Sequence, residues 1–232
     1  MMNHLVLLPG MHGTSELFPE FMNAMPEPKH IEPLCYAVGA SPTYDQLLAI
    51  VQSFAPAAGA YVLLAESYST PLAIRFASTN PPNLRGLILC AGFATSPVRG
   101  WGKLLAALIA PLAFRLPLPK AALAHFLLGK QAPESLHASV RAAIRSVEPA
   151  VFAARLLQTL KADVRAELAK VAVPILYIRA GQDRLVPTSC LEEIQRIKPQ
   201  TEVVKIDGPH LILQREPRRA AEAVARFLQR LA

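Results

Sequence analysis

Three residues far apart in the chain are of the types that together catalyse acyl transfer. Ser67, in LLAESYSTPLAIRFA, follows a short apolar run and precedes a helical pattern. Asp183 lies in RAGQDRLVP and His210 in DGPHLILQREP, and each also comes soon after an apolar run. A serine hydroxyl is a weak nucleophile that needs a histidine as base, and the histidine needs an acid to orient it. These residue types predict Ser67 as nucleophile, His210 as base and Asp183 as acid.

The turn around Ser67 departs from the usual signature of such a serine. That signature is G-x-S-x-G, because a sharp strand-to-helix turn leaves room only for small neighbours. Ala65 and Ser69 stand at the two glycine positions, and they are the next smallest choices. A serine is also a preferred N-cap residue. This stretch alone therefore leaves both roles open, nucleophile and helix cap.

Other residues compete for the roles of acid and base. Asp207 lies three residues before His210 in the same loop, and Glu66 directly precedes Ser67. Glu66 is expected to point away from the exposed side of a tight turn, and Asp183 is preferred to Asp207 because it follows a strand of its own. Among the six histidines, His210 has the best position, after the last strand. His12 could line a pocket or be an ordinary loop residue.

Short apolar runs alternate with helical patterns along most of the chain. Several runs are apolar at nearly every position, which is typical of strands buried on both faces of a parallel sheet. The alternation predicts an α/β fold with a mostly parallel sheet of about six strands flanked by helices. The predicted strands span residues 4–9, 31–37, 61–65, 84–90, 173–179 and 201–206, and the predicted helices span 44–54, 71–78, 188–197 and 217–231.

The interval 95–170 contains no convincing strand and reads as short helices separated by prolines. Ligands of open α/β sheets bind outside the carboxyl ends of the strands, and the interval leaves the sheet at such an end. We therefore expect a helical cap at 95–170 over a core formed by 1–94 and 171–232. Its segment LLAALIAPLAF, residues 104–114, is apolar all round. This predicts a helix that is buried against the core, lines an acyl pocket or touches an interface.

Composition excludes several classes of partner. The formal net charge is +7, but the basic residues are scattered and only 6% of the residues are aromatic. We therefore expect no nucleic-acid binding. The longest apolar run is too short to span a bilayer, so no stable membrane insertion is expected.

Cysteine usage and the N-terminus indicate the compartment. Three scattered cysteines without a C-x-x-C pattern favour neither a disulfide framework nor a zinc site. Cys35 and Cys90 fall in apolar runs and are expected in the core. The N-terminus lacks the basic region of a signal peptide. These features predict a cytoplasmic protein without metal, and they leave its oligomeric state open.

Four segments, LLPGMHGT, LLAESYSTPLAI, GQDRLVP and GPHLILQREP, resemble the α/β-hydrolase fold family over nearly the whole chain. The order Ser67, Asp183, His210, each after a different strand, is the order of that family. The resemblance implies that these three residues form a triad and that a helical cap follows Cys90. The chain begins almost directly on the strand of LLPG. The family's N-terminal antiparallel hairpin is therefore expected to be absent, with the strand at 31–37 at the sheet edge.

An acyl-transfer site also needs donors for the oxyanion. The N–H after the nucleophile, that of Tyr68, is one expected donor. The loop after the first strand supplies the other, and Gly10 and Gly13 let its backbone approach a ligand closely. The N–H of Met11 is the expected second donor.

Together these residues predict a cofactor-independent serine hydrolase that cleaves an ester or thioester with an apolar acyl or alcohol group through an acyl-enzyme. The same triad could serve an acyltransferase or a C–C lyase. The missing glycines leave open a ligand-binding protein with slow turnover. A basic protein held at membrane surfaces through residues 95–170 is a further reading. The identity of the substrate and its chain length stay open.

Overall fold

The computed structural model describes residues 4–26, 30–36, 39, 42–115 and 119–231 of the 232-residue chain. Six strands form one sheet in the order β2-β1-β3-β4-β5-β6, and every strand pair in it is parallel. The predicted parallel sheet of six strands is confirmed, and β2 lies at an edge as expected. The strands are β1 (His4–Leu8), β2 (His30–Pro33), β3 (Tyr61–Glu66), β4 (Leu84–Cys90), β5 (Ile175–Ala180) and β6 (Glu202–Ile206).

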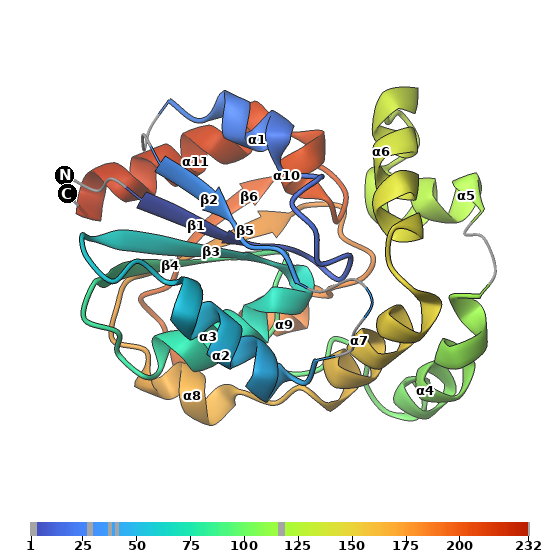
Figure 1. Cartoon of the computed structure of the whole chain (residues 1–232), viewed down its shortest axis with the longest axis horizontal. Coiled ribbons are helices and arrows are strands. Elements are labelled where there is room, and N and C mark those ends of the chain that lie inside the picture. The colour runs from blue at the N-terminus through green and yellow to red at the C-terminus, as the bar shows by residue number, and fades with distance from the viewer. Residues whose placement is uncertain (1–3, 27–29, 37–38, 40–41, 116–118, 232) are drawn as a thin grey trace.

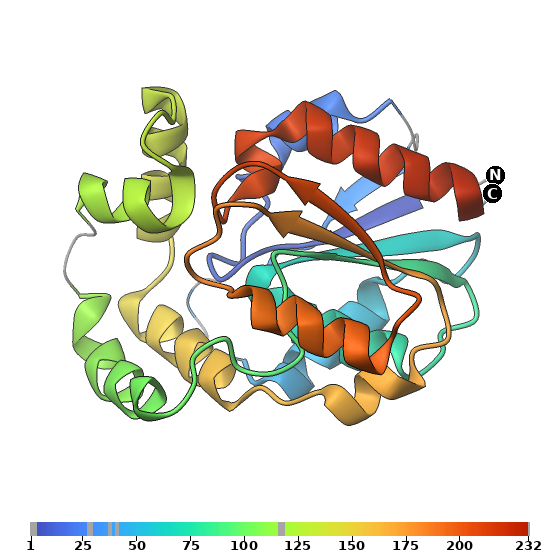
Figure 2. The same cartoon turned by 180° about the vertical axis from the view of Figure 1, so that it is seen from behind.

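Helices cover both faces of the sheet (Figure 1, Figure 2). One face packs against α1 (Pro19–Ala24), α10 (Ile212–Arg215) and α11 (Pro217–Leu231). The other face packs against α2 (Tyr44–Phe54), α3 (Thr70–Ala77), α8 (Arg165–Lys170) and α9 (Thr188–Ile197). The four predicted helices correspond to α2, α3, α9 and α11, whereas the short α1 and α10 were not predicted.

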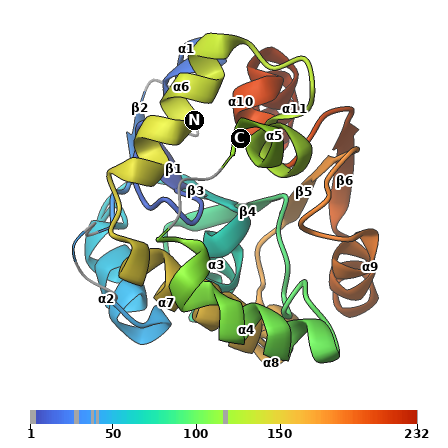
Figure 3. The same ribbon diagram turned by 90° about the vertical axis from the view of Figure 1, so that its right-hand side faces the viewer.

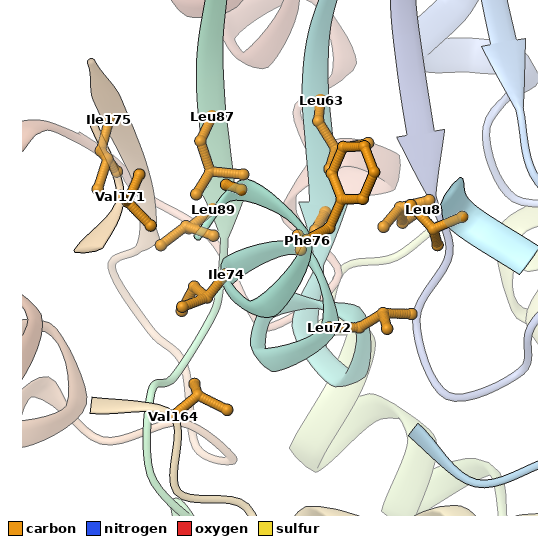
Figure 4. Packing of buried hydrophobic residues seen from close by; sticks show 14 of the residues in the cluster. Leu8, Leu63, Leu72, Ile74, Phe76, Leu87, Leu89, Val164, Val171 and Ile175 are labelled. Atoms are coloured by element: carbon orange, nitrogen blue, oxygen red, sulfur yellow. The ribbon is translucent and has the colours of Figure 1, made fainter. Parts of the chain in front are cut away.

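The two central strands carry the core. β3 is buried at every residue and β4 at all but Arg85, as expected for strands covered on both sides. Figure 4 shows Leu63, Leu87 and Leu89 of these strands packed with Ile74 and Phe76 of α3. Each such side chain contributes about 1.5–3 kcal/mol when fully buried. This core fixes the ends of β3 and β4, from which Ser67 and the long insertion leave.

Between β4 and β5 the described residues form five α-helices and one π-helical turn. They are α4 (Trp101–Ala113), α5 (Lys120–Leu123), η2 (Ala124–Leu128), α6 (Glu134–Arg145), α7 (Pro149–Lys161) and α8. Figure 3 shows α4 to α7 lying across one end of the sheet. In contrast, α8 packs against α3 and α9, and its Leu168 belongs to the main core. None of the helices in the described ranges is long and apolar enough to cross a bilayer.

One face of α4 is not buried against the core. Trp101 of α4 is 87% exposed and Leu108 is 80% exposed, and Leu104, Leu105 and Ile109 are exposed as well. These five residues, called here the α4 stripe, share one face because they follow the spacing i, i+3, i+4, i+7, i+8. The helix packs against α7, and this leaves the stripe uncovered. Of the three places expected for segment 104–114 (against the core, along an acyl pocket or at an interface), burial against the core does not hold for this face.

The two cysteines that were predicted to lie in the core differ in their burial. Cys90, at the end of β4, is buried as predicted. Cys35 is exposed, so its predicted place in the core was wrong. The physical reason is that β2 ends at Pro33, two residues before Cys35, and its apolar pattern does not continue as a strand.

Candidate active site

Ser67 lies at a sharp turn between β3 and α3. Its φ is +49°, in the left-handed region that residues with a Cβ rarely occupy, and such strain is concentrated at functional sites. The turn η1 (Ser67–Ser69) begins at this serine. Ala65 and Ser69 are both fully buried, which agrees with the small space expected on either side of the serine.

Ser69 does more than fill the place of a glycine. Its hydroxyl donates to the carbonyl oxygen of Pro9, so the hydroxyl of Tyr36, 2.7 Å away, donates to Ser69 Oγ. Both bonds are buried. The departure from glycine thereby ties the turn at Ser67 to the loop after β1, residues 9–14. This loop is called the oxyanion loop below because it carries Met11, whose N–H is a predicted oxyanion donor.

The structure brings Ser67, His210 and Asp183 into one hydrogen-bonded row. His210 Nε2 lies 2.9 Å from Ser67 Oγ, and His210 Nδ1 lies 2.8 Å from Asp183 Oδ2. The other oxygen of Asp183, Oδ1, accepts the backbone N–H groups of Leu185 at 2.8 Å and Val186 at 2.9 Å. The loop after β5 therefore holds the carboxylate in place, with one oxygen turned to the imidazole.

The two competing carboxylates lie elsewhere. Asp207 accepts a hydrogen bond from Gln182 Nε2 at 3.1 Å. Glu66 is fully buried beneath the turn, and burial raises its pKa against the smaller opposing effects of Gln214, His210 and the Gly10 N–H. Among the described residues, no group of three or more His, Cys, Asp or Glu side chains could hold a metal ion.

The oxyanion loop is a tight turn. The N–H of Gly13 donates to the carbonyl of Gly10 at 3.0 Å, and Gly13 has a φ of +76°, which favours glycine. Its own carbonyl accepts the N–H of Tyr36 at 2.7 Å. Met11, whose N–H is the predicted donor, lies inside this turn and lines the same cavity as Ser67.

His12 lies in the same turn and is nearly fully buried. Its Nδ1 is 3.2 Å from both the hydroxyl and the N–H of Thr14. Burial, and next the positive charge of Arg155, lower the pKa of His12 to about 4. The imidazole is therefore neutral at neutral pH and brings no charge to the cavity.

Tyr68, the residue after the nucleophile, is fully buried and held at both ends. Tyr44 Oη donates to its carbonyl oxygen at 2.9 Å. Its own hydroxyl donates to Gln158 Oε1 of α7 at 2.6 Å, and Gln158 Nε2 donates to the carbonyl of Pro42 at 2.9 Å. Helix α7 thereby holds Tyr68, whose N–H is one of the two predicted oxyanion donors.

A cavity of about 300 Å³ opens beside Ser67 and His210. Most of its wall consists of apolar side chains from the 95–170 segment. His12, Ser67 and His210 are the only polar side chains that line it among the described residues. The apolar lining comprises Met11, Leu17, Phe114, Ala122, Leu123, Phe126, Leu127, Val140, Ile144, Phe152, Leu156, Leu185 and Leu211. Phe114 is the residue of segment 104–114 that lines this cavity, in keeping with one of the three places expected for that segment.

The sequence reasoning missed the supporting residues of the site. Tyr36, Tyr44 and Gln158 hold the turn at Ser67, and Arg155 of α7 contacts the oxyanion loop. Of these residues, only Arg155 could have been recognised from the sequence pattern. It is a single charged residue in the apolar run AVFAARLLQTL, on the same helix face as Phe152 and Thr159. A charge on a buried face usually has a dedicated partner.

Comparison with solved structures shows the same fold in enzymes of several kinds. A bromoperoxidase from Bacillus anthracis superposes with a TM-score of 0.85 at 15% identity, covering 99% of this chain and 92% of that one. An esterase from Exiguobacterium antarcticum gives 0.85 at 15% identity (98% and 92% covered), and a thermophilic esterase from Thermogutta terrifontis 0.79 at 20% (98% and 90%). At these identities the likeness shows the fold alone.

No curated protein matches the chain. Residues 43–208, most of the chain, match the model of a protein family described as serine aminopeptidase, S33. The matched range includes Ser67 and Asp183 and the helices that cover them. With its six-stranded parallel sheet and its solved neighbours, the chain thus belongs to the serine aminopeptidase S33 family of α/β-hydrolases.

Proposed function

We propose that the chain is a serine hydrolase that cleaves a carboxylic ester or thioester with an apolar acyl or alcohol group. The observation that carries this proposal is the hydrogen-bonded row of Ser67, His210 and Asp183 beside an apolar cavity. The order and placement of the three residues in the chain support it independently.

In the proposed mechanism, Ser67 Oγ attacks the acyl carbonyl while His210 Nε2 takes the hydroxyl proton. The tetrahedral oxyanion accepts hydrogen bonds from the N–H groups of Met11 and Tyr68. As the intermediate collapses, His210 returns the proton to the leaving alcohol or thiol, and an acyl-Ser67 ester remains. Water, deprotonated by His210, then attacks this ester, and His210 returns the proton to Ser67 Oγ as the acid is released. Asp183 holds the imidazole in the tautomer with Nδ1–H and stabilises the imidazolium.

The residues of the cavity favour an apolar substrate group. Nearly all side chains around it are aliphatic or aromatic. The polar ones among the described residues are His12, Ser67 and His210. Burying one methylene is worth about 0.8 kcal/mol, or roughly fourfold in an equilibrium constant. A linear acyl chain should therefore gain specificity until it fills the cavity.

A panel of acyl p-nitrophenyl esters and acyl thioesters of graded chain length tests this proposal. We expect kcat/KM to rise about fourfold per methylene over the short chains, and then to level off. Leu156→Trp, which fills part of the cavity, should move the optimum to shorter chains. An activity without dependence on chain length, or an optimum unchanged in this variant, would contradict the proposed acyl pocket.

The alternatives that share the triad differ in their products. Product analysis with and without added alcohols or thiols separates hydrolysis from acyl transfer, and release of a carbon acid would indicate a C–C lyase. Tight binding of an ester with negligible turnover would favour the ligand-binding protein.

We also propose that the protein works in a reducing, cytoplasmic compartment. This proposal is supported by its three cysteines, all of which are free thiols.

A second candidate function, attachment to an anionic membrane surface, gains support from the α4 stripe. The stripe presents a tryptophan, three leucines and an isoleucine to solvent. Arg99 and Arg115, which are exposed, flank the helix, and Lys103 lies within it. Apolar residues beside basic ones are typical of helices that lie in the membrane interface. Since Phe114, the residue directly after α4, lines the cavity, such attachment would bring the cavity close to amphiphilic substrates.

Sedimentation with phosphatidylserine-containing vesicles tests this candidate. We expect binding that weakens with added salt, and at least tenfold weaker binding for the double variant Leu104→Gln, Leu108→Gln, because the apolar contact is lost. Ala138→Gln with Ala142→Gln, on the exposed face of α6, is the control and should bind normally. The contrary outcome is a wild-type protein that does not bind vesicles but forms a concentration-dependent dimer, which the leucine double variant does not form. That result would show that the stripe contacts a second copy of the chain.

A further inference from the structure

Arg155 of α7 is the largest fully buried side chain of the described residues, with 1% of its surface exposed. A guanidinium is costly to bury without partners that accept its hydrogen bonds. Its Nη1 donates to two carbonyl oxygens of the oxyanion loop, that of Met11 at 2.8 Å and that of His12 at 3.0 Å. The buried guanidinium of α7 therefore binds the loop that carries the predicted oxyanion donor Met11.

The space for this cation is made by Gly13. A Cβ at Gly13 would lie 2.5 Å from Arg155 Nη1 and 2.9 Å from Cζ, so no larger residue fits there without moving the guanidinium. Tyr36 borders the other side, with its ring centroid 5.8 Å from Arg155 Cζ. That tyrosine also donates to Ser69 Oγ. The guanidinium is thus enclosed between the oxyanion loop and the residues that brace the turn at Ser67.

A continuous row of peptide groups leads from Arg155 to the Met11 N–H. Arg155 donates to the carbonyl of His12, and the same peptide group carries the N–H of Gly13. That N–H donates to the carbonyl of Gly10 at 3.0 Å, whose peptide group carries the N–H of Met11. Hydrogen bonds in series polarise one another. The positive charge of the guanidinium therefore makes the Met11 N–H a stronger donor, besides fixing its position.

We propose that Arg155 is a positioning residue that aligns and polarises the Met11 N–H for the oxyanion of the reaction. This inference rests on the proposed function, since it assigns a role within the same acyl-transfer site. Arg155 does not line the cavity, so it acts on the transition state through the loop and leaves binding of the apolar group unchanged. The cap segment thereby contributes a group to catalysis in addition to a wall for the substrate.

The test compares Arg155→Met with the control Arg145→Met, an exposed arginine on α6. We expect kcat to fall about 10- to 100-fold in Arg155→Met, less than the 10²–10³-fold cost of removing an oxyanion donor outright. KM should stay within about twofold, because the cavity is not touched. A merely structural role would change KM and folding together with kcat. Methionine replaces the apolar stem of the arginine with an unbranched, adaptable side chain and removes only the charged donor group.

Chemical rescue provides the second readout. In Arg155→Ala, low millimolar guanidinium should restore part of the lost kcat, whereas the same concentration of tetramethylammonium should not. Should either variant fail to fold by circular dichroism, Arg155→Lys takes its place. Lysine keeps a cation but not the planar guanidinium, and an intermediate kcat with unchanged KM is expected for it.

The outcomes separate this inference from the proposed function. Ester hydrolysis that persists in Ser67→Ala would overturn the proposed function. Hydrolysis that requires Ser67 but proceeds with normal kcat in folded Arg155→Met and Arg155→Lys would overturn the role of Arg155 alone. A loss of kcat with unchanged KM and recovery with guanidinium supports both.

Discussion

Replacing Ser67 by alanine is expected to lower kcat for the best ester of the panel by about 10⁶-fold. The variant removes the only atom that forms the covalent bond, and His210 Nε2, 2.9 Å from Ser67 Oγ, is left without its reaction partner. Some acceleration over water should remain from the oxyanion donors and the apolar cavity. Initial rates with a chromogenic ester, at enzyme concentrations high enough to detect the residual rate, measure the loss.

Ser139→Ala is the matched control, because Ser139 is an exposed serine of α6 and its hydroxyl bonds only to the carbonyl of Ser135 among the described residues. It should keep normal kcat. An activity reduced less than about tenfold in Ser67→Ala, with the protein free of wild-type contamination, would show that another group attacks the substrate.

Asp183→Asn is expected to lower kcat by about 10⁴-fold with little change in overall structure. The carboxylate accepts the Leu185 and Val186 N–H groups through Oδ1 and binds His210 Nδ1 through Oδ2. An asparagine keeps the first two bonds through its carbonyl oxygen but presents an amide donor to His210. The imidazole then carries its proton on Nε2 and cannot accept the proton of Ser67. Steady-state kinetics of the purified variant give the loss.

The matched variant is Asp207→Asn. Asp207 contacts Gln182 and lies only three residues from His210 in the sequence, so it is the acid that sequence proximity would favour. Near-normal turnover in Asp207→Asn with a large loss in Asp183→Asn is the expected pair of results. The reverse pair would transfer the role of the acid to Asp207.

Strand and helix alternation were predictable because burial on both faces leaves a strong apolar pattern. β3 and β4 are apolar along nearly their whole length, and parallel packing follows from that. The short α1 and α10 carry too few residues for a periodic signal. The surroundings of α4 were not predictable either. The sequence of a helix that is apolar all round does not show whether it packs against the sheet, contacts a partner or is exposed to solvent.

The row of Ser67, His210 and Asp183 could be proposed from the order of these residues in the sequence and from their positions just after predicted strands. Parallel strands bring their carboxyl ends to one edge of the sheet. The contacts that hold the site could not. Tyr36, Ser69 and Pro9 meet only after β1, β2 and β3 pair. Arg155 reaches Met11 across 144 residues of sequence, and no local pattern encodes such a contact. Of the two missing glycines, the one replaced by Ser69 is explained by the bond of that serine to Pro9, and the other is replaced by the small, fully buried Ala65.

Labelling with an alkyl fluorophosphonate tests the central claim most directly. Ser67 Oγ attacks phosphorus, fluoride leaves, and the adduct is located by mass spectrometry of the proteolysed protein. We predict one adduct, on Ser67, that forms rapidly in the wild type, much more slowly in Asp183→Asn and not at all in Ser67→Ala. An adduct on another residue, or labelling that persists in Ser67→Ala, would contradict the assignment of Ser67 as the nucleophile.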